Sequence, residues 1–177
     1  MRFSFPDVKV RFFMRMVIGL TVVVLISLFA CTDSRQPDMR KGASEAMAPD
    51  FHLKDLTGRE FTLSNLKGKP VLLIFITTWC PTCRSEMPHY KNIYETYGQQ
   101  GLEVVSIDIQ ESKTRVSQFA EKNRVSYRML LDENGDVAGA YEVRGIPAMV
   151  LVGKDGTIIS KQYGVVDTLL ETLFAKK

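Results

Sequence analysis

The sequence predicts an α/β domain in which helices flank a mixed β-sheet. An unbroken apolar run at 71–76 is typical of a strand buried on both faces. A helical apolar pattern and a second strand-like run at 102–109 follow it, and this order favours parallel pairing. Near the C-terminus, Lys154-Asp155-Gly156 separates two more strand-like runs, which predicts an antiparallel hairpin. Parallel and antiparallel pairing together require a mixed sheet.

The first half of this domain is predicted to contain an N-terminal β-hairpin extension, the buried strand and a long helix. Residues 51–54 and 60–63 are short strand-like segments around a turn at 55–58. The long helix is predicted to end at Gly98 and Gly101. Its apolar face consists of residues three and four apart: Tyr90, Ile93, Tyr94 and Tyr97.

The second half is predicted to alternate helices and strands before it ends in a hairpin and a helix. Its elements after the 102–109 strand are a helix around 116–120 that ends near Asn123, a strand at 128–131, a turn at 133–135, a short helix at 136–141, and hairpin strands at 148–152 and 157–163. A last helix has one apolar face, formed by Val166, Leu169, Leu170, Leu173 and Phe174.

Charge separates the chain into a basic start and a neutral remainder. The formal net charge of the 177 residues is +3. Residues 1–30 contain four basic side chains against Asp7, so the rest of the chain carries no net formal charge. A neutral body gives no electrostatic reason to expect nucleic acid as a partner.

The basic start precedes an apolar run at 16–30, an arrangement typical of an export signal. A membrane-spanning helix needs about 20 residues, so this run is short for one. It ends in Leu28-Phe29-Ala30-Cys31, which resembles the lipobox of bacterial lipoproteins. That resemblance implies cleavage before Cys31 and lipid on its thiol. An uncleaved N-terminal anchor is the alternative, and both interpretations place the body outside the cytoplasm.

These patterns divide the chain into three parts. We expect a signal segment at 1–30, a lipid-anchor cysteine with a flexible tether at 31–48, and a folded domain at 49–177. The tether is predicted because residues 32–48 are mostly polar or small and show no periodicity.

The strongest chemical motif is Trp79-Cys80-Pro81-Thr82-Cys83-Arg84, at the predicted junction of the buried strand and the long helix. Free N–H groups and the positive dipole end of a helix N-terminus stabilise an anion, so we expect a lowered pKa for Cys80. Pro81 suits the first helical position, where its missing N–H costs nothing. Cys83, one turn further, is expected to be buried and to resolve a mixed disulfide.

Half of a zinc site is the alternative explanation of this cysteine pair. Zinc requires four ligands, and the predicted domain offers His52 and His89 besides the two cysteines, at no familiar zinc spacing. A structural disulfide is also disfavoured, because closing so short a loop constrains the unfolded chain little. We therefore expect redox chemistry with no metal and no cofactor.

Separate motifs in the expected order resemble the TlpA/ResA-type thioredoxin-like proteins over residues 48–175. The motifs are Ala48-Pro49-Asp50-Phe51, Leu66-Lys67-Gly68-Lys69-Pro70-Val71, the run from Trp79 to Pro88, Val143-Arg144-Gly145-Ile146-Pro147 and Lys154-Asp155-Gly156. The resemblance implies a thioredoxin-like fold and a membrane-tethered bacterial thiol–disulfide oxidoreductase. Its substrates would be protein thiols and disulfides of the cell envelope, and a membrane protein would supply electrons.

The resemblance also implies roles for individual residues around the motif. Pro147 corresponds to the family's cis-proline, which faces the disulfide and shapes the groove for the substrate backbone. We expect Ile146, Trp79 and Pro81 to contribute to the same substrate-binding surface. The family more often has Thr after the cis-proline, and this chain has Ala148 instead.

Glu86 matches an acidic residue near the active site of ResA-type proteins. A carboxylate in a partly apolar pocket is expected to shuttle a proton to or from Cys83. In thioredoxin itself a buried Asp lies six residues before the first cysteine, and here that position is Ile74. Glu86 is therefore the acid that the sequence indicates. The alternative is a solvated glutamate in the first turn of the helix.

Two other functions compete with disulfide exchange. A thiol peroxidase of the peroxiredoxin type shares the fold, and Thr77 precedes Cys80 by three residues as in that family's motif, but Leu73 replaces its proline. A Sco-like copper-binding module uses a CxxxC motif and a distant histidine, whereas this chain has CxxC and no histidine after His89. Within disulfide exchange, Pro81-Thr82 does not decide between reductase and oxidase or isomerase.

Overall fold

The computed structural model describes residues 46–163 and 166–175, so the predicted signal segment, Cys31 and most of the tether lie outside the described residues. None of the helices in these two ranges has the length and apolar character needed to cross a membrane. The strands are β1 (His52–Asp55), β2 (Glu60–Thr62), β3 (Val71–Ile76), β4 (Glu103–Ile109), β5 (Arg128–Asp132), β6 (Ala148–Val152) and β7 (Ile158–Tyr163). The helices are η1 (Leu63–Leu66), α2 (Pro81–Tyr97), η2 (Gly98–Gln100), α3 (Lys113–Lys122), α4 (Asp136–Ala140) and α5 (Asp167–Phe174).

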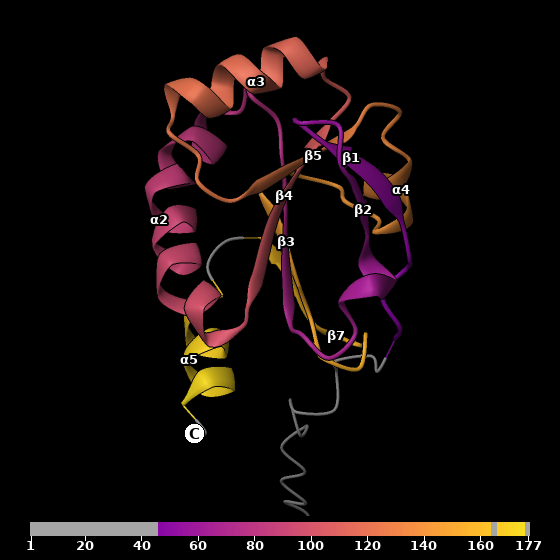
Figure 1. The fold of residues 1–177 in the computed structure, drawn as a ribbon, viewed down its shortest axis with the longest axis vertical. Coiled ribbons are helices and arrows are strands. Elements are labelled where there is room, and N and C mark those ends of the chain that lie inside the picture. The colour runs from indigo at the N-terminus through magenta and orange to yellow at the C-terminus, as the bar shows by residue number, and fades with distance from the viewer. Residues whose placement is uncertain (1–45, 164–165, 176–177) are drawn as a thin grey trace, which may run out of the picture. The chain divides into compact units, whose positions relative to one another are not determined.

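The strands form one seven-stranded sheet in the order β2-β1-β5-β4-β3-β6-β7 (Figure 1). Its centre is parallel, because β4 pairs in parallel with both β3 and β5. On one side β6 pairs antiparallel with β3, and β7 returns antiparallel to β6. The predicted mixed sheet is therefore confirmed.

The N-terminal hairpin extends the opposite side of the sheet, as predicted. β1 pairs antiparallel with β2 and also with β5, so the hairpin covers an edge of the parallel centre. β2 ends at Thr62, one residue earlier than the sequence indicates, because the chain turns there into η1. The Asp50 carboxylate holds this turn by accepting the Ser64 backbone N–H at 2.9 Å.

Two apolar cores lie on the two faces of the sheet. In Figure 1, α2, α3 and α5 lie on one side of the sheet and α4 on the other. β3 serves both cores by alternation, since Ile74 and Ile76 face the α2 side while Leu73 and Phe75 face the α4 side. Burying one such side chain fully contributes about 1.5–3 kcal/mol. The strand that leads into the cysteine motif is thus held from both faces.

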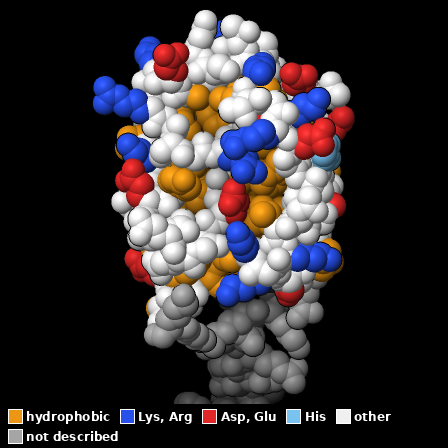
Figure 2. Space-filling view, in the orientation of Figure 1, with side chains coloured by type: hydrophobic (Ala, Val, Ile, Leu, Met, Phe, Trp, Pro, Cys, Tyr) orange, Lys and Arg blue, Asp and Glu red, His pale blue; other side chains and the backbone are white. Residues whose placement is uncertain are grey.

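Charged side chains of both signs occur on the face shown in Figure 2, where they lie among apolar patches. Lys and Arg therefore do not form a continuous basic surface there. This mixture agrees with the neutral balance of charge after residue 30.

Asp55 closes the turn of the N-terminal hairpin from a buried position. Its Oδ1 accepts the Thr57 N–H, the Thr57 hydroxyl and the Arg59 N–H, and its Oδ2 accepts the Arg59 Nε–H at 3.0 Å. Burial by itself raises the pKa of Asp55, but the bonds from Thr57 and Arg59 together outweigh it and lower the pKa from 3.8 to about 2. The ionised form of Asp55 therefore stabilises the fold.

We predict that Asp55→Asn lowers the free energy of unfolding by about 1–2 kcal/mol at pH 7. Because the pKa of Asp55 is lower in the folded state, this contribution is complete above about pH 4 and is lost as the pH falls towards 2. Urea unfolding followed by circular dichroism across this pH range measures it. Asp155→Asn is the matched control, since Asp155 closes a similar but exposed turn at Thr157. An equal loss for Asp55→Asn at all pH values would contradict the prediction.

Candidate active site

The Cys80-Pro81-Thr82-Cys83 motif lies at the edge of the sheet where β3 ends and α2 begins. β4 is parallel to β3 and β6 is antiparallel to it, so the end of β4 and the start of β6 lie at the same edge. In this register Asp108 of β4 is the partner of Ile76, and Ala148 of β6 is the partner of Phe75. The topology thus gathers distant segments of the sequence around the motif.

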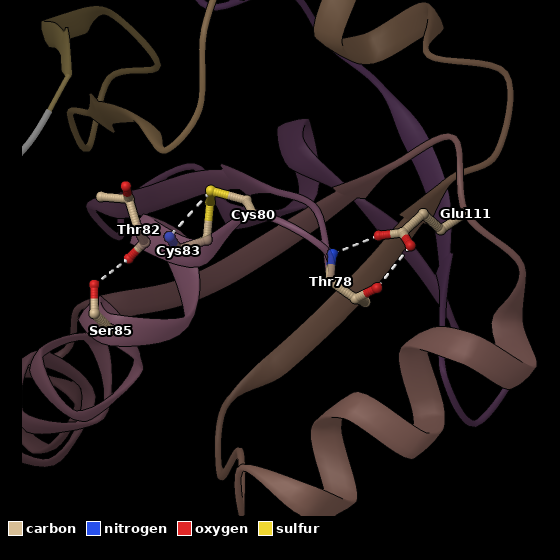
Figure 3. The surroundings of a disulfide bond; sticks show 6 residues. All are labelled: Thr78, Cys80, Thr82, Cys83, Ser85 and Glu111. Atoms are coloured by element: carbon tan, nitrogen blue, oxygen red, sulfur yellow. Dashed lines mark hydrogen bonds between the residues drawn. A yellow bond between two sulfur atoms is a disulfide. The ribbon is translucent and has the colours of Figure 1, made fainter.

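Cys80 is the N-cap of α2, as predicted. Its backbone is extended, its Sγ accepts the Cys83 N–H at 3.1 Å, and Pro81 occupies the first turn of the helix. Cys80 and Cys83 form a disulfide with their Cα atoms 5.3 Å apart (Figure 3). A sulfur in this position receives a helix N–H and faces the positive end of the helix dipole, which stabilises a thiolate after reduction.

The two cysteines differ in their exposure. Cys80 is 5% exposed and Cys83 is fully buried among the apolar side chains between α2 and the sheet. Trp79, directly before Cys80, is 62% exposed, and Pro81 is exposed as well. A partner molecule that approaches this edge therefore meets the exposed Trp79 and Pro81 beside Cys80, while Cys83 stays inside.

The peptide bond between Ile146 and Pro147 is cis, as the resemblance implied. Pro147 directly precedes Ala148, whose register partner Phe75 lies at the end of β3, so this loop and the motif share one edge of the sheet. Ile146 is half-buried and packs against the apolar cluster that contains both cysteines.

Tyr163 is a further residue at this edge that the sequence did not single out. It is the register partner of Ala148, and its side chain is largely exposed. Its hydroxyl accepts the Arg144 N–H at 3.4 Å, so its ring lies against the loop that carries Pro147. An aromatic residue at the end of a predicted strand was the available signal, and only the pairing of β6 with β7 brings it to the proline.

Glu86 lies on α2 in a half-buried position, one turn after Cys83. Burial, and after it the negative charge of Glu86, raises the pKa of Tyr90. Glu86 therefore lies close enough to influence the buried face of α2. Its predicted role in moving a proton for Cys83 stays a prediction.

Two buried acids that the sequence reasoning missed lie at the end of β4. Glu111 accepts hydrogen bonds from the Thr78 N–H and from the Thr78 hydroxyl, the latter at 2.6 Å (Figure 3). Asp108 is 1% exposed. The signal for both was an acid at the end of an apolar strand next to the one that carries the motif. Glu111 therefore stabilises the turn that positions Cys80.

The two histidines considered as zinc ligands lie apart from the motif's chemistry. His52 is exposed on β1 and contacts Thr62 and Glu60. His89 lies on α2 with its Nε2 at 3.2 Å from Asp167 of α5. Among residues 46–163 and 166–175, no three His, Cys, Asp or Glu side chains gather as a metal site requires.

Comparison with protein-family models matches residues 45–167 to the AhpC/TSA family. The chain is 39% identical over 111 residues to the thiol-disulfide oxidoreductase ResA of Geobacillus thermodenitrificans, and this alignment covers 63% of the chain. It spans 64% of that ResA protein, which is less than two thirds of its length. The ResA protein of Halalkalibacterium halodurans is 31% identical over 158 residues, which cover 89% of each chain.

A solved structure gives the same assignment of the fold. The thioredoxin domain of a thiol-disulfide oxidoreductase from Bacteroides vulgatus superposes with a TM-score of 0.66 at 26% identity. The superposition covers 74% of this chain and 95% of that one. The thioredoxin-like fold expected from the sequence is confirmed.

We predict that Cys80 of the reduced protein reacts with iodoacetamide at least about tenfold faster than Cys83. Cys80 lies at the helix N-cap and is slightly exposed, whereas Cys83 is fully buried, and the reactive species is an accessible thiolate. Timed alkylation followed by peptide mass spectrometry resolves the two sites. In urea both cysteines are exposed, and their equal rates there serve as the reference. Equal alkylation rates of Cys80 and Cys83 in the folded protein would contradict this assignment of roles.

Proposed function

The chain belongs to the AhpC/TSA family, and within it we propose a thiol–disulfide oxidoreductase that reduces disulfides of envelope proteins through the Cys80–Cys83 couple. The observation that supports this proposal is the disulfide at the N-terminus of α2, at the same sheet edge as the cis-Pro147 loop. The relatives named ResA carry the same activity in their names.

In the proposed reaction the reduced protein gives two electrons to a partner disulfide. The Cys80 thiolate attacks one sulfur of the partner, a mixed disulfide forms, and the partner's other sulfur leaves as a thiolate. The Cys83 thiolate then attacks the Cys80 sulfur, which restores the Cys80–Cys83 disulfide and releases the partner in its dithiol form. Glu86 is proposed to take the proton that Cys83 loses in the second step.

The substrate surface is proposed to consist of Trp79, Pro81, Ile146 and Pro147. Trp79 and Pro81 are exposed beside Cys80, and the cis-proline loop lies at the same sheet edge. An exposed aromatic ring offers apolar contact to an extended segment of the partner. Ala148 brings no hydroxyl to this surface, so selectivity would depend on shape and apolar contact.

Location and anchoring form a separate part of the proposal. We propose that the domain works on the outer side of the membrane, tethered through residues 31–48 and a lipid on Cys31, with a membrane protein as its electron donor. Support comes from the basic start, the apolar run at 16–30 and the lipobox-like Leu28-Phe29-Ala30-Cys31.

We predict that Cys83→Ser accumulates mixed disulfides between Cys80 and envelope proteins, because the attack that releases the partner is lost. Diagonal electrophoresis and mass spectrometry detect these adducts, and the same variant loses insulin-reductase activity. Ser85→Ala is the matched control, since Ser85 is an exposed hydroxyl residue in the same turn of α2 and bonds to the Thr82 carbonyl. The proposal is contradicted if Cys83→Ser forms no adducts and the wild-type protein shows no insulin-reductase activity.

The direction of electron flow is decided by a redox titration of the Cys80–Cys83 couple. A midpoint potential well below the poise of the compartment supports a reductase, and a strongly oxidising value contradicts that part of the proposal. Rapid turnover of hydrogen peroxide with a thiol reductant would instead identify a thiol peroxidase.

We predict that radiolabelled palmitate is incorporated into the protein in a bacterial host and that Cys31→Ser abolishes the incorporation. A lipobox cysteine is the single site of acylation in this proposal, so the loss should be complete. Cys80→Ser is the matched control and should keep the label. Absence of label from the unaltered chain would refute the lipid anchor in favour of an uncleaved N-terminal segment.

A further inference from the structure

A pair of buried carboxyl groups lies beneath the turn that leads to Cys80. Asp108 is 1% exposed at the end of β4, and no described residue donates a hydrogen bond to either of its oxygens. The Glu111 carboxyl lies within hydrogen-bonding reach of it. Two carboxyl groups form a hydrogen bond with each other when one of them carries a proton. Burial and proximity therefore favour a proton on one of the two carboxyl groups.

The surrounding donors determine which carboxyl holds this proton. The Thr78 N–H and hydroxyl both donate to Glu111, and Arg115 Nε lies 3.6 Å from the same carboxylate. These contacts stabilise negative charge on Glu111. Burial, followed by the charge of Glu111, raises the pKa of Asp108 to about 8. At neutral pH Asp108 is thus mostly protonated.

The pair is linked to the redox couple by backbone and by packing. Glu111 holds Thr78, two residues before Cys80, and the Cys80 N–H donates to the Thr77 carbonyl at 3.3 Å. Asp108 is the register partner of Ile76, which packs in the same apolar cluster as both cysteines.

Few other charges face Asp108. Glu111 and, from α3, Arg115 act on it. β3 and β5 present Ile76 and Leu131, and α2 presents the cysteines themselves. Asp132 of β5 is engaged elsewhere, because it accepts the N–H groups of Val137 and Ala138 at the start of α4. Few other charges would therefore weaken the repulsion between a thiolate at Cys80 and the carboxyl groups of Asp108 and Glu111.

Building on the proposed function, we propose that Asp108 is a positioning residue of the redox couple. The proton on Asp108 limits the negative charge under the Thr77–Cys80 turn, and loss of that proton opposes formation of the Cys80 thiolate. The coupling is reciprocal, so a thiolate at Cys80 makes the proton on Asp108 harder to remove by the same factor. Asp108 touches no substrate and acts through charge.

The experiment titrates both groups in the full chain. Aspartate labelled with carbon-13 at the carboxyl reports Asp108 as the resonance that titrates near pH 8 in the oxidised protein. Peptide-resolved alkylation from pH 5 to 10 reports the ionisation of Cys80 in the reduced wild type and in Asp108→Asn.

Whichever of the two groups ionises second should carry the shift. We expect either a rise of the Asp108 midpoint on reduction or a fall of the Cys80 midpoint in Asp108→Asn, by about half a unit to one unit. Glu103→Gln removes one charge at the other end of β4 and should leave both midpoints in place.

The proposal is overturned if neither midpoint moves, or if Glu103→Gln moves them equally. If Asp108→Asn does not fold, Asp108→Ser replaces it in the alkylation series, so the outcome is decided whichever group ionises second. Neither measurement involves a partner protein. Failure of the mixed-disulfide trap would therefore count against the proposed function and leave these titrations unchanged.

Discussion

The first N–H groups of a helix have no backbone partners within the helix, and those of α2 lie at the edge of the sheet where β3 ends. The Sγ of Cys80 accepts one of them, from Cys83. This interaction marks the start of α2, with Cys80 slightly exposed and Cys83 fully buried behind it. β3 is buried on both faces, so the position of this N-terminus is fixed by two cores at once. The reactivity of the cysteine motif thus depends on the packing of β3 against both apolar cores, which include many residues outside the motif.

Hydrogen bonds from Thr78 to the buried carboxylate of Glu111 hold the turn between β3 and α2. Burying a carboxylate without partners costs several kcal/mol, and Glu111 avoids this cost by accepting two bonds from Thr78. For Asp108, burial and the nearby charge of Glu111 raise the pKa and thereby favour the neutral form. Both acids thus reduce the free-energy cost of burying a carboxylate. As a result, the titratable carboxyl group of Asp108 lies behind the redox centre.

The chain has a thioredoxin-like fold, and its own buried acids and aromatic residues surround the redox centre. Thioredoxin itself has a buried Asp on the strand before the motif, and Ile74 occupies that position here. The buried acid Asp108 of this chain lies instead on the neighbouring strand β4. On the substrate side Ala148 lacks a hydroxyl, while Tyr163 adds an exposed aromatic ring beside the cis-proline loop.

Local patterns in the sequence were enough to predict the strands, the helices, Cys80 as helix cap and Cys83 as the buried cysteine. Those features follow from short-range physics: apolar periodicity selects strand or helix, and proline after a cysteine suits a first helical turn. Pro147 was predicted as the cis-proline through family resemblance, because a local sequence alone makes a cis bond improbable. Asp108, Glu111 and Tyr163 acquire their places only when β4 and β7 take their register beside β3 and β6. Register is set by long-range packing, so the sequence by itself determined the redox motif, and only the tertiary structure decided which charges and aromatic rings surround it.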